Sequence, residues 1–192
     1  MNRAAVAVRE ICEICATPIG GGHGHLVDMR DRRLLCACRP CYLLFVPQGA
    51  AQGRYRAVGD RYERLDDRIF DGPHWEALQI PIGLAFFFHN SAMGRVVGFY
   101  PGPAGATESQ LPLDAWEQLS REVPLLASMR PDVEGVLVHR DREGRIEAYL
   151  LPIDACYELT GLVRTSWEGI DGGDRSRAVL DEFFAKIRER CA

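Results

Sequence analysis

Cys12-Glu13-Ile14-Cys15 and Cys36-Ala37-Cys38-Arg39-Pro40-Cys41 bound the stretch that decides how this chain is organised. Five of the seven cysteines fall within it. Two Cys-x-x-Cys pairs separated by a loop are the usual way to hold a tetrahedral metal, because each pair forms a tight turn that points two thiolates at one ion. The spacing therefore predicts a metal site made by Cys12, Cys15, Cys38 and Cys41.

Two further side chains in this stretch are alternative ligands. Cys36 precedes Cys38 by two residues, so both thiols would lie on one side of an extended strand and Cys36 could replace Cys38. His23 and His25 also alternate toward one side, and His25 could offer an imidazole ligand. The sequence leaves open whether Cys36 binds the metal or packs beside it.

A short hairpin is predicted between the two cysteine pairs. Residues 17–24 form a loop, because proline interrupts regular structure and glycine supplies backbone angles that other residues avoid. Residues 25–29 then alternate into a strand, and residues 33–37 return as its partner. If the second cysteine pair also opens a helix, the metal-binding module over residues 11–48 is a zinc ribbon or a treble clef.

A second domain is predicted over residues 54–192, after a linker that contains proline and glycine. Its expected elements are a strand at 54–58, a hairpin of 80–89 with 95–100, a hairpin of 133–139 with 145–151, and helices at 114–121, at 154–167 and from 174 onward. Residues 101–109 are expected to form a loop, because they are rich in proline and glycine. Hairpins grouped in this way predict an α+β domain, in which an antiparallel sheet has helices packed on one face.

The composition is that of an ordinary soluble globular protein, with 47% hydrophobic and 26% charged residues. No run of about 18 uncharged apolar residues exists, so no membrane span is predicted.

The first ten residues are too short and too charged for a signal peptide. Clustered cysteines without an export signal favour a cytoplasmic location and thiolate ligands over disulfides. The net charge of −4 argues against nucleic acid as the main partner, because phosphate binding requires a positive field.

Several strings along the chain are distinctive: His25-Leu26-Val27-Asp28, Leu34-Leu35-Cys36-Ala37-Cys38-Arg39-Pro40-Cys41, Leu84-Ala85-Phe86-Phe87-Phe88, Phe99-Tyr100-Pro101-Gly102-Pro103-Ala104-Gly105-Ala106-Thr107-Glu108 and Leu151-Pro152-Ile153-Asp154-Ala155-Cys156-Tyr157-Glu158-Leu159. Together they resemble an uncharacterised, mainly actinobacterial family whose members are often encoded beside nickel–iron hydrogenase genes. The resemblance covers nearly the whole chain. It implies a hydrogenase context and suits an accessory or maturation protein whose partner is a hydrogenase subunit or a maturation factor.

Three functional hypotheses follow. In the first, four thiolates saturate a structural zinc ion, which leaves no open position for water. The zinc would fix a docking patch for an acidic partner, made by Arg30, Arg32, Arg33 and Arg39, whose charge Asp28 and Asp31 partly offset.

The second hypothesis is a rubredoxin-like iron electron carrier for the hydrogenase. Rubredoxin-like proteins also bind iron with two such pairs, but a glycine usually follows each pair, and here Ala16 and Tyr42 take those places. The third is an enzyme with its pocket in the α+β domain, for which no nucleophile–base pair stands out.

Overall fold

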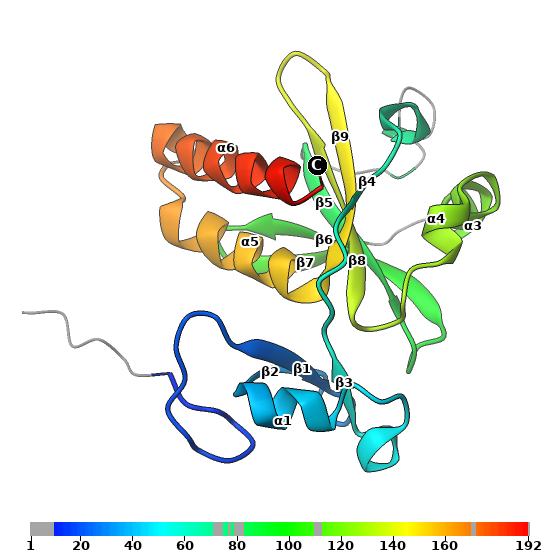
Figure 1. The fold of residues 1–192 in the computed structure, drawn as a ribbon. Helices are drawn as coiled ribbons and strands as arrows, with labels where there is room; N and C mark the ends of the chain where they lie inside the picture. The colour runs from blue at the N-terminus through cyan, green and yellow to red at the C-terminus, as the bar shows by residue number, and fades with distance from the viewer. Residues whose placement is uncertain are drawn as a thin grey trace, which may run out of the picture. The chain divides into compact units, whose positions relative to one another are not determined.

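The chain folds into two compact units, one ending at Val58 and the other beginning at Gly59 (Figure 1). The computed structural model describes residues 10–70, 75–76, 78, 83–109, 113–169 and 172–191. The fold is mixed α+β, and its sheets are antiparallel: one of three strands in the first unit and one of six in the second. Across those described ranges, no helix has both the length and the hydropathy needed to cross a membrane.

The first unit is a small sheet with one short helix. β1 (Gly24–Asp28) and β2 (Arg33–Ala37) form the predicted hairpin, and β3 (Tyr55–Ala57) pairs with the other edge of β1. Helix α1 (Arg39–Leu44) follows β2, and the 3-10 turn η1 (Ala50–Gly53) precedes β3. The core of the unit is made by Cys12, Leu26, Leu35, Ala37 and Cys41.

The first unit extends to Val58, because it includes β3. The predicted ranges, 11–48 for the metal-binding module and 54–192 for the second domain, placed the boundary earlier. The strand expected to open the second domain instead extends the first sheet. The Met29 N–H donates to Arg54 O at 2.8 Å, and the Val58 N–H donates to His25 O at 3.0 Å. Without β3 the second edge of β1 would present unpaired backbone groups, so a strand that follows in the chain satisfies them.

The second unit is built on one six-stranded sheet with the order β4-β9-β8-β5-β6-β7. The two predicted hairpins are β5–β6 and β8–β9, and the pairing of β5 with β8 joins them. The strands are β4 (Glu63–Arg64), β5 (Leu84–Asn90), β6 (Arg95–Gly102), β7 (Gly105–Ser109), β8 (Glu134–Arg140) and β9 (Ile146–Pro152). The helical elements are η2 (Asp67–Phe70), α3 (Leu113–Glu122), α4 (Pro124–Ala127), α5 (Ile153–Ser166) and α6 (Gly173–Arg190).

Helices cover both faces of this sheet, so the expectation that they pack on one face was wrong. Phe86 and Phe87 are consecutive in β5 and fully buried, and their side chains point to opposite faces. The Phe86 ring centre lies 6.2 Å from that of Tyr157 in α5, whereas the Phe87 ring centre lies 5.0 Å from that of Trp116 in α3. Accordingly, α5 and α6 lie on one side of the sheet and α3 and α4 on the other (Figure 1).

The loop expected over residues 101–109 is mostly strand. β6 continues through Pro101 to Gly102, and β7 pairs back on it with Gly102 opposite Gly105. Gly105 has a φ of 109°, an angle that glycine adopts without steric cost. The proline and glycine residues that suggested a loop therefore form the tight turn of a third hairpin and its flanks.

A buried carboxylate joins β1 to the segment before β3. Asp28 is only 3% exposed, and it accepts hydrogen bonds from the Arg30 backbone N–H at 2.9 Å and from Arg54 Nη2 at 3.1 Å. Burial acts to raise the pKa of Asp28, but the hydrogen bonds from Arg30 and Arg54 outweigh it and hold the pKa below its usual range. Asp28 is thus committed to an internal pair and does not offset the arginines on the surface of the hairpin.

Replacing this carboxylate tests its role. Asp28→Asn should destabilise the first unit by about 1–3 kcal/mol, because two donors lose a charged acceptor. Since the folded pKa is lowered, the wild-type advantage is complete above the unfolded value of about 3.9 and is lost as the pH falls through the folded value. Hydrogen exchange at the β1 and β3 amides of the metal-loaded protein measures this difference in the stability of the first unit. The exposed Asp31→Asn is the control, with a change within about 0.5 kcal/mol; equal protection in Asp28→Asn and wild type at neutral pH would contradict the account.

Candidate metal centre

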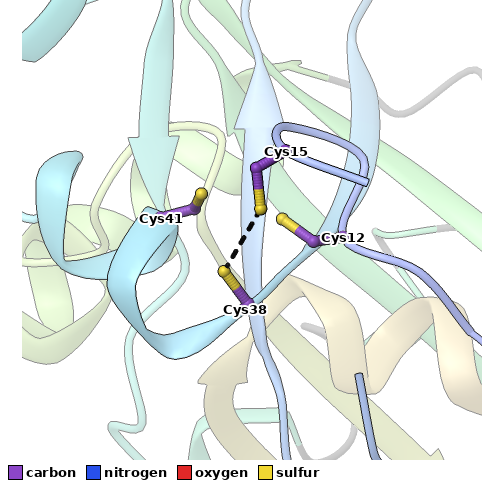
Figure 2. Close-up of side chains that lie close together, drawn as sticks. All are labelled: Cys12, Cys15, Cys38 and Cys41. Atoms are coloured by element: carbon purple, nitrogen blue, oxygen red, sulfur yellow. Dashed lines mark hydrogen bonds between the residues drawn. The ribbon is translucent and has the colours of Figure 1, made fainter. Parts of the chain in front are cut away.

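The sulfur atoms of Cys12, Cys15, Cys38 and Cys41 converge in the first unit (Figure 2). All four lie within 4.8 Å of one another, and the Sγ atoms of Cys15 and Cys38 are 3.7 Å apart. A tetrahedron with metal–sulfur bonds of about 2.3 Å has edges of about 3.8 Å, so this separation suits two ligands of one ion. Four cysteines this close together can hold a metal ion of the kind that thiolates bind.

The first cysteine pair is held by a closed turn. The Ala16 N–H donates to Cys12 O at 2.8 Å, and the Cys12 N–H donates to Thr17 O at 2.8 Å. Ala16 has a φ of 61°, the left-handed region that favours glycine. The missing glycine after Cys15 therefore does not change the turn, because alanine adopts a left-handed angle at some steric cost.

The second pair is held by the start of a helix. Cys38 precedes α1 with extended backbone angles, and Cys41 lies buried in the first helical turn. Pro40 stands at the beginning of α1, where the N–H that proline lacks would have no partner within the helix. The Tyr42 N–H donates to Cys38 O at 2.9 Å and closes this turn. The two pairs therefore reach the same point from different backbone structures.

Tyr42 also anchors the helix to the sheet. Its hydroxyl donates to Val58 O at 2.8 Å, beside β3. Its ring lies against Gly24, where a Cβ atom would come within 2.5 Å of Tyr42 Cδ2. Only glycine fits at that position of β1, so the close approach of α1 to β1 depends on it.

The four thiols differ in acidity before any ion is bound. Burial acts to raise the pKa of Cys12, but hydrogen bonds from the backbone of Cys38, Cys15 and Ile14 lower it to about 6. The Thr17 side chain lowers the pKa of Cys15. Burial, together with the sulfurs beside it, raises the pKa of Cys41 far above its ordinary value. Four negative sulfurs at these distances repel one another, so full ionisation of the cluster requires a cation between them.

The alternative ligands lie outside this cluster. Cys36 groups with His23 and His25, and one potential ligand atom from each lies within 4.8 Å of the others. Leu35 and Ala37 point into the core, so Cys36 between them faces the other side of the hairpin. Cys36 and His25 were expected as substitutes for a cysteine of the first site, but the register of the hairpin pairs them with each other. The alternation of His23 with His25 was the signal for it.

Removing the first cysteine pair tests the ligand assignment. Cys12→Ser/Cys15→Ser should abolish all-sulfur metal coordination and unfold the first unit, because four-thiolate zinc sites contribute about 10–16 kcal/mol in small modules. The second unit has its own core and should stay folded. X-ray absorption reads the coordination, and amide NMR reads the two units separately. Cys191→Ser, outside the cluster, is the control. All-sulfur coordination that persists in the double variant would refute the assignment.

The strained turn gives an independent prediction. Ala16→Gly should raise the stability of the metal-loaded first unit by about 0.5–1 kcal/mol, since relief of the left-handed strain exceeds the entropy that glycine costs. Ala16→Val should lower it, because a branched side chain fits that angle worse. Denaturant titration of the three proteins decides the order. A glycine variant less stable than wild type would show that the turn carries no strain.

Comparison with known proteins gives one family. A model described as a family of unknown function, DUF5947, matches residues 11–191. A search of curated proteins and a search of solved structures each found no match. The match includes both cysteine pairs and nearly all of the second unit, and the chain therefore belongs to the DUF5947 family.

Proposed function

We propose that this chain is a zinc-binding accessory or maturation protein of a nickel–iron hydrogenase system, which acts in the cytoplasm by binding a protein partner. The observation that carries the proposal is the convergence of four cysteine sulfurs. Four thiolates fill a tetrahedral zinc ion and leave no position for water or substrate, so the site is structural. The zinc holds the first unit in shape, and the function lies in the surface that this shape presents.

The order of elements supports a treble-clef-like module over a zinc ribbon. A turn carries Cys12 and Cys15, the β1–β2 hairpin follows, and α1 begins at the second pair. In a treble clef the second pair opens a helix in this way. The module extends past the predicted range 11–48, because β3 completes its sheet.

The backbone around the second pair favours zinc over a rubredoxin-like iron site. In rubredoxin-like sites a turn with glycine follows each pair, so that backbone amides can reach the sulfurs. Here the amide of Tyr42 is used inside α1, where it donates to Cys38 O. The two halves of the site are therefore unlike each other, which suits a structural ion more than an iron that cycles between two charges.

The surface of the first unit suits a partner that is acidic and partly apolar. Arg30, Arg32, Arg33 and Arg39 are all exposed on the hairpin and at the start of α1. Asp28 does not neutralise them, because it is buried against Arg54. Leu43 and Leu44 are 49% and 66% exposed on α1. Mixed basic and apolar surfaces of this kind are used for protein docking, and the family resemblance supplies the hydrogenase as its context.

Charge reversal in the native host tests the proposal. A strain that lacks the gene should lose hydrogenase activity, and the wild-type gene should restore it. Arg30→Glu/Arg39→Glu should restore it poorly, since like charges across an interface weaken the complex by at least about tenfold. The exposed Arg142→Glu/Arg175→Glu of the second unit is the matched control and should restore activity fully. Full hydrogenase activity in the deletion strain would overturn the proposal.

A further inference from the structure

The β1–β2 hairpin carries a second group of metal-binding side chains, away from the core that holds Cys12 and Cys41. His25 in β1 stands directly opposite Cys36 in β2. Side chains at such opposed positions have Cβ atoms about 4.5–5.5 Å apart. His23 lies two residues before His25 and so shares its side, and the two ring centres are 4.8 Å apart with an interplanar angle of 74°. A ring nitrogen from each histidine and the Cys36 sulfur all lie within 4.8 Å of one another.

The hydrogen bonding of the two His23 ring nitrogens is typical of a metal ligand. Its side chain is only 9% exposed, and its Nδ1 lies 2.8 Å from Gly20 O. A carbonyl oxygen only accepts, so Nδ1 carries a proton, and in the neutral ring Nε2 then carries the lone pair. Nε2 is buried and has no hydrogen-bond partner among the residues that the structure describes. Metal-binding histidines are held in this way, with one nitrogen donating to a backbone carbonyl and the other left to bind the ion.

We propose that His23, His25 and Cys36 form a second metal site, distinct from the four-cysteine site, that binds a divalent transition-metal ion of the zinc, nickel and copper class. Two imidazoles and a thiolate select such ions over magnesium or calcium, which prefer oxygen. Three protein ligands leave one position of a tetrahedral ion for water or an incoming ligand. The site is therefore open, where the four-cysteine site is closed, and it does not depend on the proposed hydrogenase role.

The surroundings of the second site suit an exchangeable cation. His25 and Cys36 are partly exposed, although the His23 side chain is only 9% exposed, so an ion can reach the second site from solvent beside His25 and Cys36. Glu10 and Glu13 place negative charge beside Cys36, and Glu10 Oε2 lies 3.5 Å from His23 Nδ1. These carboxylates attract a cation to the site without taking up the ligand atoms.

The two sites are coupled through hydrogen bonds between Glu13 and Cys36, and the coupling matters most for the more weakly held second ion. The Cys36 N–H donates to Glu13 Oε2 at 2.8 Å, and the Glu13 N–H donates to Cys36 O at 2.9 Å. Glu13 lies between Cys12 and Cys15, so the turn that holds the first pair also holds the backbone of Cys36. Loss of the first ion should therefore disorder the second site, whereas loss of a second-site ligand leaves the first site intact.

Metal titration of the full-length protein tests the proposal. After a mild chelator has removed weakly bound ions, equilibrium dialysis with Zn²⁺ or Ni²⁺ should show one tightly held ion and a second that exchanges. Loss of a side chain that only supports a ligand costs about 10–100-fold in metal affinity, so His25→Gln and Cys36→Ser should each weaken the second ion at least that much and keep the first. His89→Gln is the matched control, because His89 also has a buried nitrogen without a partner among the described residues but lies in the second unit. Cys12→Ser/Cys15→Ser should lose both ions.

X-ray absorption and the binding of the variants distinguish a separate second site from a role of Cys36 in the first site. X-ray absorption of the nickel-loaded protein should show mixed nitrogen and sulfur ligands, while the tightly held zinc shows sulfur alone. Retention of the all-sulfur ion in His25→Gln and Cys36→Ser reports that the first unit is folded in each. Saturation of the wild type at a single ion per chain would overturn the second site. Unchanged binding in His25→Gln would overturn it equally, and loss of the all-sulfur ion in Cys36→Ser would assign Cys36 to the first site instead.

Discussion

The first unit depends on the meeting of four thiols at one point. Its apolar core is small, and two of the core members are themselves cysteines of the cluster. The described part of this unit spans only residues 10–58, and units below about 60 residues bury so little surface that they are marginal without a metal or a disulfide. All of these cysteines are free thiols, so a shared ion is the cross-link that their geometry allows. The second unit needs no such device, because helices on both faces of its sheet close a large core.

The same hairpin serves two purposes because a strand presents alternate residues to opposite sides. Leu35 and Ala37 face the core, in which two cysteines of the four-cysteine site lie, and Cys36 faces His23 and His25. A closed site stabilises structure, whereas a three-ligand site keeps an ion accessible. Under the two proposals, the chain would combine one ion that holds the fold with donors for another that can exchange, and Glu13 would link the two.

Local chemistry could be predicted from the sequence, and distant pairing could not. The spacing of Cys12, Cys15, Cys38 and Cys41 indicated the cluster, because a Cys-x-x-Cys turn is specified within four residues. The β1–β2, β5–β6 and β8–β9 hairpins were likewise predicted, because an alternating or continuously apolar run stands on each side of a short turn. β3 was assigned to the wrong unit, because its partner strand β1 is distant in the sequence. Helices were expected on one face only, because the contacts of α3 and α5 with β5 also join residues that are distant in the sequence. The pairing of His25 with Cys36 required the register of the hairpin, which alternation alone does not give.

The central claim is that the four cysteine sulfurs hold a structural zinc ion. Elemental analysis with an absorption spectrum tests it most directly, on untagged protein purified from its native host without oxygen and treated with a mild chelator. The account predicts one zinc per chain, bound by sulfur alone, and no visible band. One iron per chain with a visible band that bleaches reversibly on reduction would contradict it and would make the chain an electron carrier.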